Sequence, residues 1–153
     1  MKNYLLCCSL ILFTFACQDK IDRPASVLKE YNLPYDNNTP AALLVQEQLD
    51  AYNKKDLDAY LIPYSDSVKV HNTLTELSYI GKEEMKQVYA RWFAGLDSLH
   101  CKLINRITSG NTIIDHEDLI YRRNGSQVIQ KSEAIAIYKV YGGKIQEVYF
   151  TNP

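Results

Sequence analysis

Three residues able to do acid–base chemistry follow one another in the second half of the sequence: Asp115, His116 and Glu117. Successive side chains of a strand point to opposite faces, so Asp115 and Glu117 would share one face and His116 would occupy the other. Two carboxylates in a closed cavity repel each other, which raises the pKa of one and gives a candidate acid–base pair. A solvated rim at the mouth of a cavity is the alternative interpretation of the two carboxylates.

The element that must position these residues is a β-hairpin centred on Asn124-Gly125, the strongest short hairpin signal in the chain. Both residues tolerate a positive φ, so we expect a two-residue type I′ turn between strands over 112–123 and 126–141. A single β-bulge would exchange the two faces of the hairpin. The expected register makes three cross-strand pairs: His116 with Glu133, Glu117 with Ser132, and Asp115 with Ala134.

The pair of His116 and Glu133 has two interpretations. One is a cross-strand ion pair with a structural role. The other is a contact at the place where a second subunit docks.

Three helices are expected before the hairpin, and cap residues mark their ends. Thr39-Pro40 is a hydroxyl N-cap followed by proline at the first helical position. Asp56 caps a second helix, which Pro63 ends. The third helix is expected over 82–94, with Gly95 as its C-cap.

Strand patterns surround these helices, and polar residues interrupt two of the apolar faces. Gln48 lies on the apolar stripe of the first helix, and Asn72 on the side that Val68 and Val70 mark as inward. Helices on one side of an antiparallel sheet make an α+β domain, which is the fold class predicted here. The expected strands are 67–72, 99–108, 112–123, 126–141 and 144–151, with a loop or short strand over 73–80.

The first residues are expected to be a targeting signal. Lys2 precedes an apolar run over 5–15 that is too short to span a bilayer as a mature helix. Ala16 before Cys17 resembles a bacterial lipobox, in which Cys17 becomes the lipidated N-terminus, although Phe15 is bulkier than usual. An ordinary secretory signal and an uncleaved anchor are the alternatives. We expect a signal peptide over 1–16, a tether over 17–38 and a domain over 39–153, anchored by lipid to a membrane of the bacterial cell envelope.

Composition argues against several partners and chemistries. The net charge of −1 and a pI near 6.3 leave no basic footprint for nucleic acid. After removal of the leader and lipidation of Cys17, only Cys101 remains, so no internal disulfide is expected. Cys101 alternates with Leu99 and Leu103, which favours a buried small hydrophobe over a nucleophile. The histidines lack ligand spacing, so neither a metal nor a cofactor is expected.

Several segments resemble the nuclear-transport-factor-2-like superfamily, and within it the SnoaL-like proteins and the ketosteroid isomerases. They are Asn53 to Ala59, Tyr64-Ser65-Asp66 before a valine strand, and Gly142-Gly143-Lys144-Ile145 at the end of a long meander. The resemblance covers Thr39 to Phe150. It implies a cone in which three N-terminal helices pack on a curved antiparallel sheet around a cavity.

The catalytic positions of the isomerases are all substituted here. Those enzymes use a tyrosine, an aspartate base and a protonated aspartate that together hold an oxyanion. By resemblance these positions fall on Gln48, Asn72 and Ala136, so ketosteroid isomerase activity is not expected. The resemblance also implies that the face of Asp115 and Glu117 points inward, over a cavity floor of small residues: Ser132, Ala134 and Ala136.

Three functions remain open from the sequence. The first is a lipid-anchored module that binds a small, largely apolar ligand. The second is an enzyme of the isomerase or hydrolase type with Asp115 or Glu117 as general base, and with Asn72 or Tyr52 holding an oxyanion. The third is a homodimeric interaction domain that pairs through its sheet face and keeps a vestigial cavity. The ligand-binding candidates are Gln48, Tyr52, Asn72, Trp92 and Ala136.

Overall fold

Three helices and six strands make up the part of the chain that the structure, a computed structural model, describes: residues 39–151. The expected signal peptide, the lipidation site Cys17 and the tether over 17–38 lie outside the described residues. The elements in chain order are α2 (Pro40–Lys54), α3 (Leu57–Leu61), β1 (Tyr64–His71), β2 (Leu77–Ile80), α4 (Lys82–Ala94), β3 (Leu96–Ser109), β4 (Thr112–Arg123), β5 (Ile129–Tyr141) and β6 (Lys144–Thr151).

The predicted helix starts are confirmed by the capping contacts. The hydroxyl of Thr39 accepts a hydrogen bond from the backbone N–H of Ala42 at 3.1 Å, and proline occupies the first helical turn. Asp56 accepts one from the N–H of Ala59, also at 3.1 Å. These contacts are local in sequence, which is why the cap residues alone locate α2 and α3.

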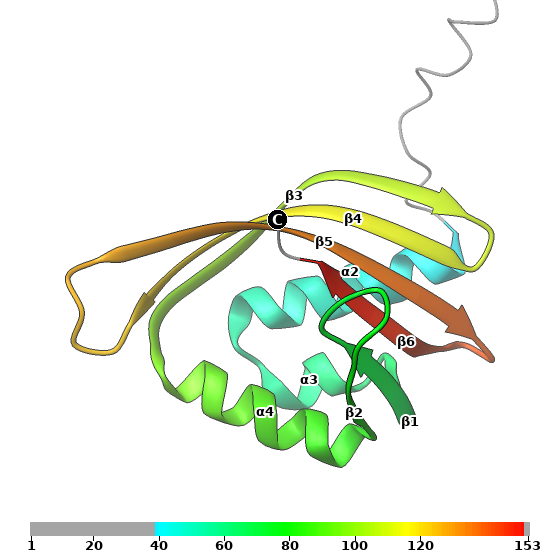
Figure 1. Ribbon diagram of the computed structural model, residues 1–153, viewed down its shortest axis with the longest axis horizontal. Helices are drawn as coiled ribbons and strands as arrows, with labels where there is room; N and C mark the ends of the chain where they lie inside the picture. The colour runs from blue at the N-terminus through cyan, green and yellow to red at the C-terminus, as the bar shows by residue number, and fades with distance from the viewer. Residues whose placement is uncertain (1–38, 152–153) are drawn as a thin grey trace, which may run out of the picture. The chain divides into compact units, whose positions relative to one another are not determined.

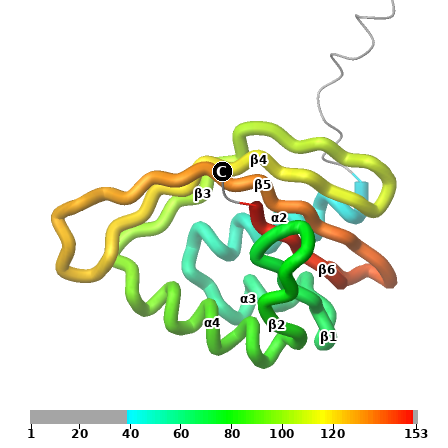
Figure 2. Tube along the Cα trace, viewed as in Figure 1, coloured from blue at the N-terminus to red at the C-terminus, as the bar shows by residue number. Residues whose placement is uncertain are grey.

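The strands form one sheet in the order β2-β1-β6-β5-β4-β3. The long strands β3 to β6 make the antiparallel meander that was expected, whereas β1 pairs in parallel with β6. Figures 1 and 2 show this sheet curving over α2, α3 and α4, which all lie on one of its faces. The helices therefore bury the concave face and leave the other face uncovered within the described residues.

The hairpin between β4 and β5 has a register two residues away from the expected one, so the expected pairs are wrong. Arg122 is the last paired residue of β4, and it lies opposite Ile129. Because the shift is even, each side chain stays on its expected face. The pairs around the site are Asp115 with Ala136, His116 with Ile135, Glu117 with Ala134, and Asp118 with Glu133.

The turn differs from expectation because Asn124 is engaged outside the hairpin. Its backbone N–H donates to the carbonyl oxygen of Gly95 at 3.0 Å, and its side-chain Nδ2 donates to that of Ala94 at 2.7 Å. Of the two central residues only Gly125 has a positive φ, 72°, which is the pattern of a type II turn and not of type I′. A contact with the end of α4 thus decides the turn.

A β-bulge in β3 changes which residues of that strand point inward. Leu103 pairs with Glu117 but Asn105 pairs with His116, so Ile104 is the extra residue. Beyond the bulge, Arg106 points to the helices and is 1% exposed, while Ile107 points outward and is 56% exposed. The bulge thereby brings a charged side chain under α2.

Candidate functional site

A cavity of about 340 Å³ lies between the helices and the concave face of the sheet. The walls are mostly aromatic and aliphatic, and all three helices contribute to them. They are formed by Gln48, Leu49, Tyr52, Tyr60, Asn72, Val88, Tyr89, Trp92, Cys101, Glu117, Leu119, Ala134, Tyr138 and Phe150.

The helical wall of the cavity is a cluster of packed aromatic rings. Tyr60 from α3 lies with its ring centre 4.4 Å from Tyr89 of α4 and 5.8 Å from Tyr52 of α2. Trp92 donates its indole N–H to the hydroxyl of Tyr52 at 2.9 Å. Burial raises the pKa of Tyr52, Tyr60 and Tyr89, so these phenols stay neutral at physiological pH. The cluster is therefore a stiff, uncharged aromatic surface.

Glu117 is the carboxylate that lines this cavity. It is 7% exposed, and burial raises its pKa to about 7, with the nearby charge of Asp115 adding to the shift. The hydroxyl of Tyr138 lies 3.5 Å from its Oε1. Glu117 therefore changes its charge near neutral pH, in a largely apolar environment.

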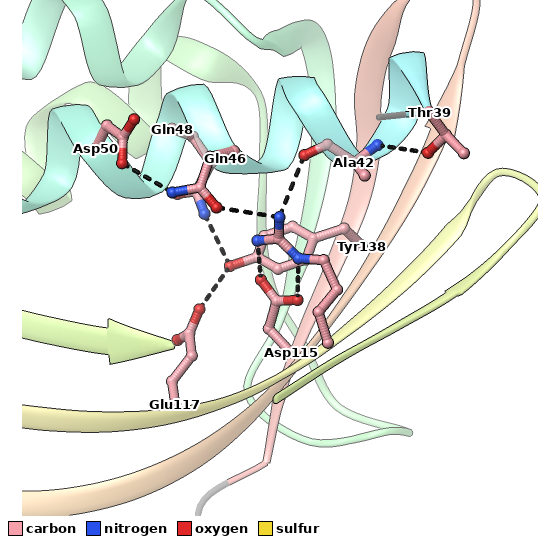
Figure 3. A network of polar contacts seen from close by, with 9 residues as sticks. Thr39, Ala42, Gln46, Gln48, Asp50, Asp115, Glu117 and Tyr138 are labelled. Carbon is pink, nitrogen blue, oxygen red and sulfur yellow. Dashed lines mark hydrogen bonds and ion pairs between the residues drawn. The ribbon is translucent and has the colours of Figure 1, made fainter. Parts of the chain in front are cut away.

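A chain of hydrogen bonds connects Glu117 to the helices. Gln48 donates from Nε2 to the hydroxyl oxygen of Tyr138 at 3.0 Å, which leaves the Tyr138 hydrogen free to donate to Glu117 (Figure 3). The hydroxyl of Tyr64 lies 3.1 Å from Oε1 of Gln48 and 3.2 Å from the Tyr60 hydroxyl. Because Gln48 is held at both ends, its amide orientation is fixed, and so is the proton donor that faces Glu117.

Asp115, two residues before Glu117, is engaged in a different way. Its two carboxylate oxygens each accept a hydrogen bond of 2.6 Å from Nε and Nη2 of Arg106, and neither side chain is exposed. Arg106 also donates from Nη1 to Gln46 Oε1 at 3.1 Å and to the Ala42 carbonyl oxygen at 3.4 Å. Burial raises the pKa of Asp115, and the guanidinium opposes that shift by favouring the ionised form. This bidentate pair fastens β3 and β4 to α2.

Comparison with known proteins adds the family to this geometry. Residues 45–148 match the model of the SnoaL-like domain. The chain belongs to the SnoaL-like domain family. No functionally curated protein matches the chain.

Solved structures share this fold at low sequence identity. A cystatin-fold protein from Novosphingobium aromaticivorans is 22% identical, with a TM-score of 0.67 over 74% of this chain and 97% of its own. A putative SnoaL-like polyketide cyclase from Shewanella denitrificans is 12% identical, with a TM-score of 0.66 over 74% and 90%. An epoxide hydrolase from Mycobacterium tuberculosis is 13% identical, with a TM-score of 0.65 over 74% and 83%. At these identities the similarity shows the fold alone.

The SnoaL-like cavity contains most of the residues proposed as ligand contacts and one of the two proposed catalytic ones. Gln48, Tyr52, Asn72 and Trp92 line it, whereas Ala136 is fully buried and is not among its lining residues. The expected floor is reduced to Ala134, because Ser132 lies on an exposed part of β5. Glu117 faces the cavity, and Asp115 does not line it, since Arg106 covers both of its oxygens.

The remaining predicted pair is His116 with Glu133, for which the structure gives a different geometry. His116 and Glu133 do not lie opposite each other, yet Nε2 and Oε2 still approach to 3.5 Å across the diagonal, on the outer face.

Within residues 39–151 no three His, Cys, Asp or Glu side chains gather in an arrangement suited to a metal ion. No helix in that part of the chain is long and apolar enough to cross a membrane.

Sequence reasoning missed two important residues of the site. Tyr138 shares the inward parity of Ala134 and Ala136, so the same alternation that placed those residues could have found it. Arg106 gave no such signal, because simple alternation from Cys101 and Leu103 places it on the outer face. Only the bulge at Ile104 turns it inward.

Proposed function

We propose that this SnoaL-like domain binds a small, largely apolar molecule in its cavity. The observation that carries the proposal is the cavity itself, about 340 Å³ of space lined mainly by aromatic and aliphatic side chains. That volume falls within the roughly 300–1,000 Å³ of small-molecule sites. Glu117 and the Gln48–Tyr138 amide–phenol pair supply the few polar groups that orient a ligand in such sites.

A broad set of small apolar compounds tests the proposal by thermal shift and by the fluorescence of Trp92. Trp92 is the one tryptophan of the sequence and lines the cavity, so a bound ligand should alter its emission. Ala134→Leu should abolish both responses, because it fills the cavity from β5. Ser132→Leu adds the same side chain to an exposed position of that strand and should leave them intact. Binding in the unmodified protein that Ala134→Leu leaves unchanged, or no binding by any compound, contradicts the proposal.

A second candidate function is an enzyme with Glu117 as general base or acid. The observation that favours it is the pKa of Glu117, about 7, which suits proton transfer at neutral pH. Similarity to an epoxide hydrolase and to a putative polyketide cyclase makes epoxides and small carbonyl compounds the first substrates to try. Glu117→Gln should abolish turnover of any substrate found, and turnover retained in that variant contradicts this role.

We also propose that the domain is held at a membrane of the bacterial cell envelope by a lipid on Cys17. The support is the apolar run over 5–15 followed by Ala16-Cys17. Cells fed a labelled fatty acid should label the unmodified protein and Cys101→Ser equally. Cys17→Ser should lose the label, and a labelled Cys17→Ser protein would overturn the assignment.

The outer face of the sheet supports pairing of two copies. An apolar row crosses it in register: Ile107 lies opposite Ile114, Ile114 opposite Ile137, and Ile137 opposite Tyr149. Tyr149 stacks on His71 at 4.2 Å between ring centres. We propose that a second copy covers this row. Ile137→Lys should then convert a dimer into a monomer in light scattering, and a dimer that survives the change contradicts the proposal.

A further inference from the structure

We propose that the ligand of the cavity is a small organic cation, an alkylated or quaternary amine, held between the Glu117 carboxylate and the aromatic wall. The inference rests on the proposed function, because it assumes that the cavity takes a small molecule. It goes further by assigning the charge of that molecule from the charges and rings that surround the space.

The charge balance of the cavity is the first support. Within the described residues 39–151, none of the side chains that line it is a lysine, arginine or histidine. The nearby buried cation, Arg106, already donates from Nε and Nη2 to Asp115, and from Nη1 to Gln46 and to the Ala42 carbonyl oxygen. When Glu117 is ionised, the buried cluster of Arg106, Asp115 and Glu117 therefore carries one excess negative charge. An ionised carboxylate in an apolar site needs a counter-charge, and a cationic ligand supplies it.

The aromatic wall is the second support. Tyr52, Tyr60, Tyr89 and Trp92 line the same space as Glu117. The three tyrosines pack against one another through tilted and edge contacts, and Trp92 is joined to Tyr52 by a hydrogen bond. A ring attracts a cation to its face, and aromatic walls are a common way to recognise alkylated ammonium groups. An alkylated ammonium also buries its methyl groups favourably, which a strongly hydrated primary ammonium does less well.

Groups from β3, β4, β5 and α2 surround Glu117 and act on its charge. Tyr138 of β5 approaches it with its hydroxyl, and Cys101 of β3 and Tyr52 of α2 share the cavity wall with it. The charges of Asp115 and Arg106 act on it in opposite directions, and burial exceeds both, so the pKa is about 7. A bound cation favours the ionised carboxylate, so cation binding should strengthen as the pH rises through 7.

The test compares two probes of nearly the same shape, choline and its uncharged analogue 3,3-dimethylbutanol. Binding to the full chain in detergent is followed by Trp92 fluorescence. Choline should bind at least ~10-fold more tightly than the alcohol at pH 8, and its affinity should fall about tenfold between pH 8 and pH 6, as the ionised fraction of Glu117 falls. The affinity of the alcohol should not fall over that range.

A matched pair of variants identifies the group responsible. Glu117→Gln should reduce choline affinity at pH 8 at least ~10-fold and leave the alcohol bound, because the amide keeps the shape and loses the charge. Asp118→Asn removes the same charge from the adjacent position of β4, whose side chain lies on the outer face, and should change neither affinity.

The outcomes separate this inference from the proposed function. If the alcohol binds as tightly as choline, or if choline affinity ignores both pH and Glu117→Gln, the cation assignment is overturned and small-molecule binding stands. If neither probe alters Trp92 emission at millimolar concentration while the apolar set binds, the cation assignment fails alone. If nothing binds, both fail.

Discussion

Asp115 and Glu117 lie two residues apart on β4 and point to the same side of the sheet, but they meet opposite surroundings. Asp115 has both oxygens covered by Arg106, and no part of either side chain is exposed. Glu117 faces a cavity and receives one long hydrogen bond, from Tyr138 at 3.5 Å. Two carboxylates on one strand thus have different roles: Asp115 belongs to a structural ion pair, and Glu117 is a candidate ligand contact.

The difference between the two carboxylates comes from what other elements bring to them. The bulge at Ile104 turns Arg106 towards Asp115, and within residues 39–151 no cationic side chain forms an ion pair with Glu117. Burial of a charge is tolerated where a partner satisfies it, and elsewhere it shifts the pKa. A raised pKa without an ion-pair partner therefore distinguishes the candidate functional residue from the structural one.

The largest expected effect is the loss of the clamp. Arg106→Met should lower the free energy of unfolding by ~3–5 kcal/mol, because it leaves Asp115 buried without a partner. Arg122→Met is the matched control, since Arg122 faces Asp97 at 3.6 Å with both side chains about 40% exposed, and it should cost less than ~1 kcal/mol. Urea unfolding of both variants measures the difference, and equal costs would show that the buried pair does not stabilise the fold.

The same comparison shows which parts of the molecule sequence alone can predict. The caps at Thr39 and Asp56 were predicted because each acts within three residues of itself. The faces of β4 were predicted because alternation survives a register error of two residues. The turn itself was not predictable from local sequence, because Asn124 is bonded to the end of α4, about thirty residues away.

The division of labour between Asp115 and Glu117 could not be predicted from the sequence. Both were expected to be polar groups of one cavity, because neither alternation nor spacing distinguishes them. The distinction depends on Arg106, whose inward direction requires the bulge at Ile104. Bulges are set by sheet curvature and packing, which are properties of the assembled domain.

The second largest expected effect is on the melting temperature at pH 8. Neutralising Glu117 should raise it, whereas neutralising Asp115 should lower it. The pKa of Glu117 is raised from 4.5 to about 7, so its contribution to stability is complete below pH 4.5 and is lost as the pH rises to 7. That loss amounts to ~3 kcal/mol above pH 7. Glu117→Gln should therefore raise the melting temperature at pH 8 and change it little at pH 4.5, if no ligand is present. Asp115→Asn should lower it at pH 8, because Arg106 then remains buried and unpaired.

Melting curves of the three proteins from pH 4.5 to 8.5 measure this contrast. The unmodified protein should lose stability between pH 4.5 and 7, and Glu117→Gln should lose less. Asp115→Asn should also lose less, because it removes the negative charge that raises the pKa of Glu117 and leaves the Arg106 charge that lowers it. A pH dependence unchanged by Glu117→Gln would mean that Glu117 does not carry the shifted pKa.

A smaller effect is expected from the hydroxyl between Gln48 and Glu117. Tyr138→Phe removes the acceptor of Gln48 Nε2 at 3.0 Å and the donor to Glu117, at a cost of ~1–3 kcal/mol for the buried groups left unsatisfied. It should also raise the pKa of Glu117 above 7, because the hydroxyl stabilises the ionised form. A carboxyl titration followed by NMR measures the shift, with Tyr141→Phe on the exposed end of β5 as control. A lowered pKa would contradict the hydrogen-bond direction assigned here.

The smallest effect is expected from the pair of His116 and Glu133 on the outer face. His116 lies between Asp115 and Glu117 in sequence, but its contact with Glu133 is 3.5 Å long, and the two side chains are 38% and 61% exposed. Such pairs contribute about 0–1 kcal/mol. The double variant His116→Ala, Glu133→Ala should therefore change the free energy of unfolding by less than ~1 kcal/mol, and less at high salt. Size-exclusion of the same variant tests the proposed dimer. That dimer should persist, because the proposal assigns the contact between the two copies to the apolar row centred on Ile137 and not to this pair. If the double variant is monomeric, the pair formed by His116 of β4 and Glu133 of β5 belongs to the interface.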